Sequence, residues 1–189
     1  MISKAVVIGA SAGGLEALKK ILVQLEDNFR MPVLVVQHIS AHSDNYLTVH
    51  LNNLCKINVK EAEEKEKILA GTAYFAPPNF HMLVEEDYSI SFTVDKKINY
   101  ARPSIDVLFE TAAYAFGQRL IGIILTGANN DGARGLEKIK QFGGITIVQD
   151  PAESEVDIMP RAAIERAKPD YLLKLDEIAA YLNKGSDKL

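Results

Sequence analysis

Cysteine and tryptophan are almost absent from this chain. Its 189 residues include one cysteine, Cys55, and no tryptophan. A single cysteine excludes a disulfide framework within the chain and fits a protein of the reducing cytoplasm, which is the location that we expect. The lack of tryptophan has no bearing on function.

Positive charge and long apolar runs are also scarce. The 21 Lys and Arg residues are outnumbered by 25 Asp and Glu residues, for a net charge of -4, and they form no dense cluster. We therefore expect no nucleic-acid partner. The first apolar run starts at Ala5 and is far too short for a signal peptide or a membrane span, so we expect no insertion into a membrane.

The chain otherwise has the composition of an ordinary globular domain. Its hydrophobic fraction is 48% and its charged fraction is 24%. A chain of this length can bury one sizeable core, and no linker rich in proline, glycine or serine divides it. We predict one domain over residues 1–189, without a cofactor or a bound metal.

Short apolar runs alternate with helical patterns along the chain. Residues 5–8 and 33–36 are rich in β-branched side chains, which is typical of buried strands, and leucines and isoleucines at helical spacing separate them. This alternation predicts an α/β fold, with a doubly wound, mostly parallel sheet and helices on both faces. Residues 73–76, 81–84 and 89–94 look like hairpin-type strands, an antiparallel excursion from that sheet. We expect further strands at residues 57–59, 120–125, 145–148 and 171–173, and further helices at residues 47–54, 105–116 and 136–142, after Pro160 and from Asp176.

A glycine-rich run, GASAGG at residues 9–14, joins the first predicted strand to the first helix. A dinucleotide-binding turn would need glycine where Ser11 stands, because a Cβ there keeps the backbone away from a pyrophosphate, and an acid where His38 follows the second strand. A nucleophile elbow, G-x-S-x-G, instead needs this serine, which the tight turn lifts clear of the sheet. The next helix would then offer free N–H groups to an oxyanion. On this motif alone, Ser11 could equally be a simple helix cap.

Two further polar residues follow predicted strands. His38 comes directly after the second strand, and Asp131 lies in the loop GANNDG, residues 127–132, after the strand at 120–125. The carboxyl ends of parallel strands meet at one edge of a sheet, where open α/β folds bind their ligands. Serine is a poor nucleophile unless a histidine takes its proton, and a buried carboxylate holds that histidine in the right tautomer. The sequence thus predicts a catalytic triad of Ser11, His38 and Asp131.

Other residues compete for these roles. Asp106 lies inside a helical pattern and Asp150 precedes Pro151 in a looser loop, so both are weaker candidates for the acid. Asp131 itself could simply cap the next helix. The order serine, histidine, acid differs from that of the α/β-hydrolases, which disfavours that family. Surface or capping roles are expected for the other histidines, His42, His50 and His81.

Several ordered motifs make the chain similar to a known family. It resembles the catalytic domain of the chemotaxis-receptor methylesterases, the CheB family, over nearly its whole length. The shared motifs are GASAGG (9–14), QH (37–38), KEA (60–62), AYFAP (73–77), HM (81–82), RPSID (102–106), LTG (125–127), NDG (130–132) and MP (159–160).

The resemblance implies an activity and the residues that perform it. Family members hydrolyse γ-glutamyl methyl esters on the helical cytoplasmic part of chemoreceptors, and many also deamidate receptor glutamines. The expected partner is therefore the methylated cytoplasmic domain of a chemoreceptor. By resemblance, Ser11 is the nucleophile, His38 the base and Asp131 the acid, and the oxyanion hole uses backbone N–H groups at Ala12 and Ala128.

One cation of the shared motifs is a candidate for substrate binding. Arg102, in the RPS motif, could contact a glutamyl ester beside acidic receptor helices. A surface arginine or an arginine paired with a nearby acid fits the sequence as well.

The chain departs from the family pattern at three places. Ala12 stands where the family often has threonine, and residues 127–129 read GAN where the family often has Gly-Met-Gly, although Ala128 keeps a backbone donor. Typical members also carry an N-terminal receiver domain, which covers the site until it is phosphorylated. Here the first catalytic strand begins at Ala5, so we expect no receiver domain and control by a separate regulatory protein, by expression level or by the receptor itself. Two alternative functions stay open, a related esterase with another substrate and, less favoured, a Rossmann-like nucleotide-binding module.

Overall fold

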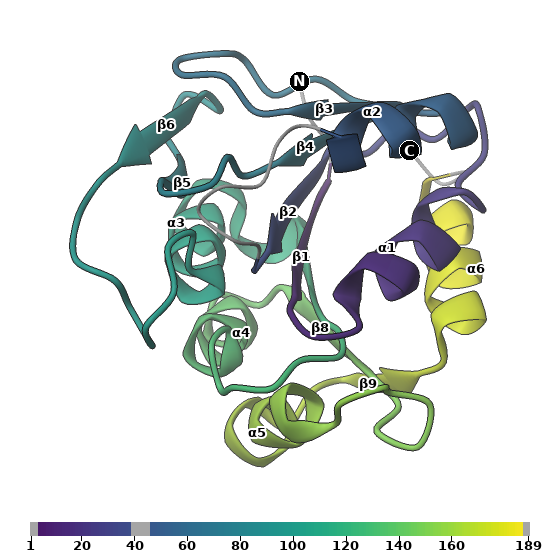
Figure 1. Cartoon of the computed structure of the whole chain (residues 1–189), viewed down its shortest axis with the longest axis vertical. Coiled ribbons are helices and arrows are strands. Elements are labelled where there is room, and N and C mark those ends of the chain that lie inside the picture. The colour runs from purple at the N-terminus through teal and green to yellow at the C-terminus, as the bar shows by residue number, and fades with distance from the viewer. Residues whose placement is uncertain (1–3, 39–45, 187–189) are drawn as a thin grey trace.

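The computed structural model describes residues 4–38 and 46–186. A seven-stranded sheet has the order β3-β4-β2-β1-β7-β8-β9, and all its neighbouring strands pair in parallel (Figure 1). A second sheet is the antiparallel pair β5 and β6. The strands are β1 (Ala5–Ala10), β2 (Val33–Gln37), β3 (Asn58–Glu61), β4 (Thr72–Phe75), β5 (His81–Val84), β6 (Ile90–Thr93), β7 (Leu120–Ile124), β8 (Ile145–Gln149) and β9 (Tyr171–Leu173).

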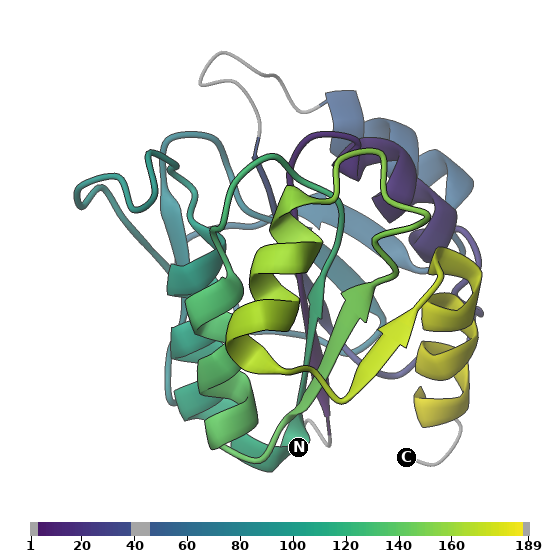
Figure 2. The same cartoon turned by 90° about the horizontal axis from the view of Figure 1, so that it is seen from below.

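Helices cover both faces of the large sheet. α1, α2 and α6 pack on one face, and α3, α4 and α5 pack on the other (Figures 1 and 2). A short 3₁₀ turn, Gly117–Arg119, follows α3. The helices are α1 (Gly14–Leu22), α2 (Tyr46–Leu54), α3 (Ile105–Phe116), α4 (Ala133–Gln141), α5 (Ile158–Ala167) and α6 (Leu175–Ser186).

β1 shows why the sheet needs a layer of helices on each side. All of its residues are buried. Val6 and Ile8 belong to the core beneath α1, α2 and α6, whereas Ala5 and Val7 belong to the core beneath α3, α4 and α5. Because alternate side chains of a strand point to opposite faces, a strand that is apolar at every position must be covered on both sides.

The strand order places the predicted triad at one edge of the sheet. From β1 the chain proceeds to β2 and then to β3 and β4, which lie beyond β2 on the same side of β1, and it later returns to β7 on the other side of β1. In open α/β sheets such a switch point opens a crevice at the carboxyl ends of the strands. Ser11 follows β1, His38 follows β2 and Asp131 lies in the loop after β7.

The predicted fold class and the antiparallel hairpin are confirmed, but one strand is misplaced in the prediction. Residues 73–76 are predicted to be a hairpin-type strand, whereas β4 lies inside the parallel sheet between β2 and β3. Ala73 and Phe75 face one core and Tyr74 faces the other, so this strand is covered on both sides. The apolar run is too short to distinguish the two placements by its pattern.

The start of α5 also differs from the prediction. α5 begins at Ile158 and contains Pro160 in its first turn, rather than starting after it. Proline is tolerated there because the N–H that it lacks would have no partner within the helix. In the part of the chain that the structure describes, no helix is long and apolar enough to cross a membrane.

Candidate active site

The turn after β1 presents Ser11 at the carboxyl edge of the sheet. The Ser11 N–H donates to the Thr126 carbonyl at 3.0 Å, and the Gly14 N–H donates to the Ser11 carbonyl at 2.9 Å. The N-cap of α1 is Gly13, whose φ of 74° suits glycine, so Ser11 is not the helix cap. The Ser11 hydroxyl has no hydrogen-bond partner among the described residues, which leaves it available for a bound molecule.

Side chains from neighbouring strands hold this turn in place. The Gln37 amide donates to the Ser11 carbonyl at 2.8 Å and to the His38 carbonyl at 3.0 Å, so it ties the serine turn to the end of β2. The Thr126 hydroxyl donates to the Ala12 carbonyl at 2.9 Å. A Cβ on Gly127 would lie 2.9 Å from the Cβ of Ser11, so this approach requires glycine.

His38 lies between the serine turn and the acid. Its backbone N–H donates to the Ala10 carbonyl at 3.0 Å. Its ring Nε2 lies 2.9 Å from Oδ2 of Asp131, and its Nδ1 lies 3.3 Å from Nδ2 of Asn129. The side chain is 13% exposed, so solvent reaches only a small part of the ring.

The Asp131 carboxylate is completely buried and well supplied with donors. Burial by itself raises the pKa of Asp131, but the hydrogen bonds from His38 and from the Ile105 N–H outweigh it and hold the pKa below its ordinary value. Asp131 therefore stays ionised as the partner of the imidazole. Besides His38, its donors are the Ile105 N–H at 2.7 Å, the Ser104 hydroxyl at 2.9 Å, the Asn99 amide at 3.1 Å and the Asp106 N–H at 3.2 Å.

The Asp131 carboxylate lies against the N-terminus of α3 and does not cap α4. Ser104 is the N-cap of α3, and Ile105 is its first helical residue, so their donors point at Asp131 from a helix N-terminus. The positive end of the helix dipole favours a carboxylate there. The N-cap of α4 is Gly132, so the alternative that Asp131 caps the next helix is not met.

Asp106, the rival acid, is engaged elsewhere. Its carboxylate accepts the Gly135 N–H of α4 at 2.7 Å and the Asn99 amide at 3.2 Å. Burial raises the pKa of Asp106, and the nearby charge of Asp131 acts in the same direction. The Asn99 amide thus bridges the two buried carboxyl groups, and only Asp131 contacts His38.

Ser11 and His38 line the same cavity, which has a volume of about 290 Å³. Arg102 lines it as well. Nη1 of Arg102 donates to the carbonyls of Val94 at 2.6 Å and Asp95 at 3.0 Å, and its buried Nε has no partner among the described residues. These contacts fasten the segment after β6 to the site. Arg102 makes no ion pair with a described residue, and its contact with substrate stays a prediction.

The two expected oxyanion donors lie on the surface turns beside Ser11. Ala12 and Ala128 are both exposed. Neither backbone N–H donates to any residue that the structure describes, so both are available to a bound oxyanion. The Gly127 N–H donates to the Val156 carbonyl at 3.0 Å, which anchors the loop in front of Ala128.

Among the other histidines, His81 differs from its predicted surface or capping role. It is 1% exposed, and its Nδ1 accepts the Ser104 N–H at 3.1 Å. His81 therefore supports the N-terminus of α3 from behind. His50 stacks on Tyr46 with a centroid distance of 5.8 Å, and His42 lies outside the described residues.

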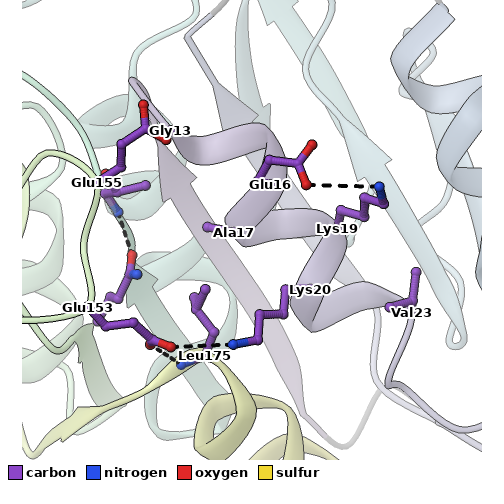
Figure 3. A pocket seen from close by; sticks show the side chains of 11 residues that line it. Gly13, Glu16, Ala17, Lys19, Lys20, Val23, Glu153, Glu155 and Leu175 are labelled. Atoms are coloured by element: carbon purple, nitrogen blue, oxygen red, sulfur yellow. Dashed lines mark hydrogen bonds and ion pairs between the residues drawn. The ribbon is translucent and has the colours of Figure 1, made fainter.

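A second cavity, of about 400 Å³, lies behind the serine turn against α1 (Figure 3). Several of the charged side chains that line it form ion pairs with one another. Lys20 lies 3.4 Å from Glu153, and Lys19 lies 3.9 Å from Glu16. Neither Ser11 nor His38 lines this space. Over the described residues, no group of three or more His, Cys, Asp and Glu side chains could hold a metal ion.

The residues that hold Ser11, His38 and Asp131 in place were not predicted from the sequence. Gln37 and Ser104 lie within the motifs quoted above, next to His38 and Arg102, and this adjacency was the available signal. Asn99 and Asn129 had no signal of their own, because their roles depend on loops that bring them to Asp131 and His38.

Known proteins resemble this chain both in sequence and in structure. Residues 6–182 match the family model described as CheB methylesterase. A relative from Leptospira interrogans is 53% identical over 176 residues, which cover 93% of this chain and 91% of the relative. One from Syntrophus aciditrophicus, named protein-glutamate methylesterase/protein-glutamine glutaminase 2, is 39% identical over 94% of this chain and 52% of its own length. The crystal structure of the CheB methylesterase catalytic domain of Thermotoga maritima superposes with a TM-score of 0.92 at 35% identity, covering 97% of this chain and 99% of that one.

Proposed function

This chain belongs to the CheB methylesterase family, and on that premise we propose that it hydrolyses γ-glutamyl methyl esters on the cytoplasmic helices of chemoreceptors and releases methanol. The observation that carries this proposal is the contact between His38 and the buried Asp131 beside the cavity that Ser11 lines. A histidine held by a buried carboxylate, next to a serine on a tight strand-to-helix turn, can activate that serine.

The reaction proceeds through an acyl-enzyme. Ser11 Oγ attacks the ester carbonyl carbon while its proton passes to His38, and Asp131 stabilises the imidazolium. The tetrahedral oxyanion accepts hydrogen bonds from the backbone N–H groups of Ala12 and Ala128. The methoxy oxygen then takes the proton from His38 and leaves as methanol. A water molecule, deprotonated by His38, attacks the acyl carbon and yields the glutamate carboxylate and free Ser11.

The same site suits receptor glutamines. An amide carbonyl is attacked in the same way, and the leaving group departs as ammonia after it takes the proton from His38. The relatives' paired name, methylesterase and glutaminase, supports this second reaction.

Partner and location follow from the substrate. We propose the methylated cytoplasmic domain of a chemoreceptor as the partner and the cytoplasm as the location, which the single cysteine also favours. We also propose that residues 1–189 hold one catalytic domain, which the family match over residues 6–182 supports. We further propose that a separate regulatory protein or the receptor controls the activity. A nucleotide-binding module is disfavoured, because Ser11 occupies the glycine position and His38 is engaged with Asp131.

Methanol release tests the proposal. Membranes that carry methyl-labelled chemoreceptors should release labelled methanol with the wild type and not with Ser11→Ala. Hydrolysis of a small activated ester without any release from receptors would instead favour a related esterase with another substrate. Equal release by both proteins would remove Ser11 from the mechanism.

A further inference from the structure

The residue two positions before the acid contacts the base. Asn129 lies in the loop between β7 and α4 and lines the same cavity as Ser11 and His38. Its side-chain oxygen accepts the Asp131 N–H at 3.0 Å, and its side-chain nitrogen lies 3.3 Å from Nδ1 of His38. The proposed mechanism uses neither contact.

The first contact determines the orientation of the Asn129 amide. A backbone N–H can only donate, so the atom that faces the Asp131 N–H must be the amide oxygen. The atom that faces His38 is then the NH₂ group, which can only donate. Nδ1 of His38 must therefore present its lone pair to Asn129.

The other ring nitrogen agrees with this assignment. A neutral imidazole with a lone pair on Nδ1 carries its proton on Nε2. Nε2 lies 2.9 Å from the ionised Asp131, which needs a donor. The opposite tautomer would place two donors face to face at Asn129 and two acceptors face to face at Asp131.

The tautomer decides which nitrogen can act as the base. Asp131 is buried and does not line the cavity, whereas Asn129 does, so Nδ1 lies on the cavity side of the ring with Ser11. We propose that Asn129 is a positioning residue that keeps the proton of His38 on Nε2 and so makes Nδ1 the atom that takes the Ser11 proton. The inference of a base role rests on the proposed function, whereas the tautomer itself does not.

The contact is weak enough to yield during turnover. At 3.3 Å it is long for a hydrogen bond, and the Ser11 hydroxyl has no competing partner among the described residues. When substrate brings Ser11 Oγ to the ring, its O–H replaces the Asn129 N–H on the same lone pair. The lone pair stays on Nδ1 throughout.

Three substitutions test this role. Asn129→Asp keeps the shape but puts an oxygen against Nδ1, which then has to carry a proton in either the neutral or the doubly protonated ring. Asn129→Ala removes the contact without reversing it. Asn130→Asp makes the same chemical change at the adjacent, exposed position and is the matched control.

Two measurements are made on each protein. Nitrogen-15 NMR of labelled histidine, with the His38 signal identified by its loss in His38→Gln, reports which ring nitrogen is protonated. Initial rates on a small activated ester give kcat and KM separately, without dependence on receptor binding. Circular dichroism identifies any variant that does not fold, in which case the wild-type spectrum and Asn129→Ala decide.

We expect the neutral wild-type ring to carry its proton on Nε2 and the Asn129→Asp ring to carry one on Nδ1. Relative to Asn130→Asp, kcat of Asn129→Asp should fall by about 10²-fold or more, with KM within about twofold, because a protonated Nδ1 cannot accept from Ser11. Asn129→Ala should populate both tautomers and lose about three- to tenfold in kcat.

Two results would overturn the inference. One is a wild-type ring with its proton on Nδ1, and the other is an Asn129→Asp protein with the tautomer and kcat of Asn130→Asp. If the wild type shows the expected tautomer and hydrolyses the small ester but releases no methanol from receptors, the inference stands and the proposed substrate is wrong.

Discussion

Replacing Asp131 by asparagine should lower both stability and activity, because an amide cannot accept all the hydrogen bonds that the carboxylate accepts. If the amide oxygen takes the place of Oδ2, the NH₂ group faces the Asn99 amide and the Asp106 N–H, which can only donate. In the other orientation, the NH₂ group faces the Ile105 N–H. In both cases at least one N–H of α3 loses its acceptor.

The magnitude follows from these losses. A hydrogen bond to a charged group contributes about 1.5–3 kcal/mol, and a buried donor without a partner costs about 1–3 kcal/mol. We therefore expect the free energy of unfolding to fall by about 2–5 kcal/mol. In either orientation the imidazolium of His38 also loses its counter-charge, so kcat should fall by about 10³- to 10⁴-fold.

Urea unfolding followed by circular dichroism measures the stability change at pH 7. Asp27→Asn, the same chemical change at an exposed position, is the control and should stay within about 0.5 kcal/mol of the wild type. If Asp131→Asn is as stable as Asp27→Asn, the carboxylate is not held by the α3 donors in the way described, and the placement of the acid has to be abandoned.

Four further outcomes can be measured. Ser11→Ala and His38→Ala should each lower esterase turnover by about 10³-fold or more, because triad members act as a unit, and near wild-type rates in either would refute its assigned role. Arg102→Ala should raise KM for receptor substrate more than for a small activated ester, whereas equal effects would show that Arg102 only fastens the loop to Val94 and Asp95. Acetyl phosphate should leave the esterase rate of the 189-residue chain unchanged, because Ser11 and His38 already line a cavity, and strong stimulation would reveal a phosphorylatable acid that controls the site. The pKa of Asp131 is lower in the folded protein than in the unfolded chain, so its stabilising effect is complete above the unfolded value of about 4 and disappears as the pH falls through the folded pKa; the stability difference between the wild type and Asp131→Asn should shrink over that acidic range, and a difference that grows there would contradict the lowered pKa.

The amino-acid sequence by itself determined the fold class and the positions of the proposed triad residues along it. Continuous apolar runs such as those of β1 and β2 have to be covered on both faces, and helices at regular spacing supply the cover. Polar residues directly after such runs fall at one edge of a parallel sheet. Ser11, His38 and Asp131 were therefore predictable from their places after three strands.

The tertiary structure alone decided what surrounds those residues. The donors to Asp131 come from α3, about 25 residues earlier in the chain, and His81 is buried behind Ser104 although its local sequence favours a surface strand. The place of β4 in the parallel sheet also depends on contacts between distant segments, because residues far away in the sequence bury both of its faces. Local pattern specifies which face of an element is apolar, but hydrogen-bond partners depend on how loops bring distant segments within about 3 Å of one another. The tautomer of His38 is the clearest example of a property that the local sequence cannot specify, because it depends on the orientation of the Asn129 amide, 91 residues away.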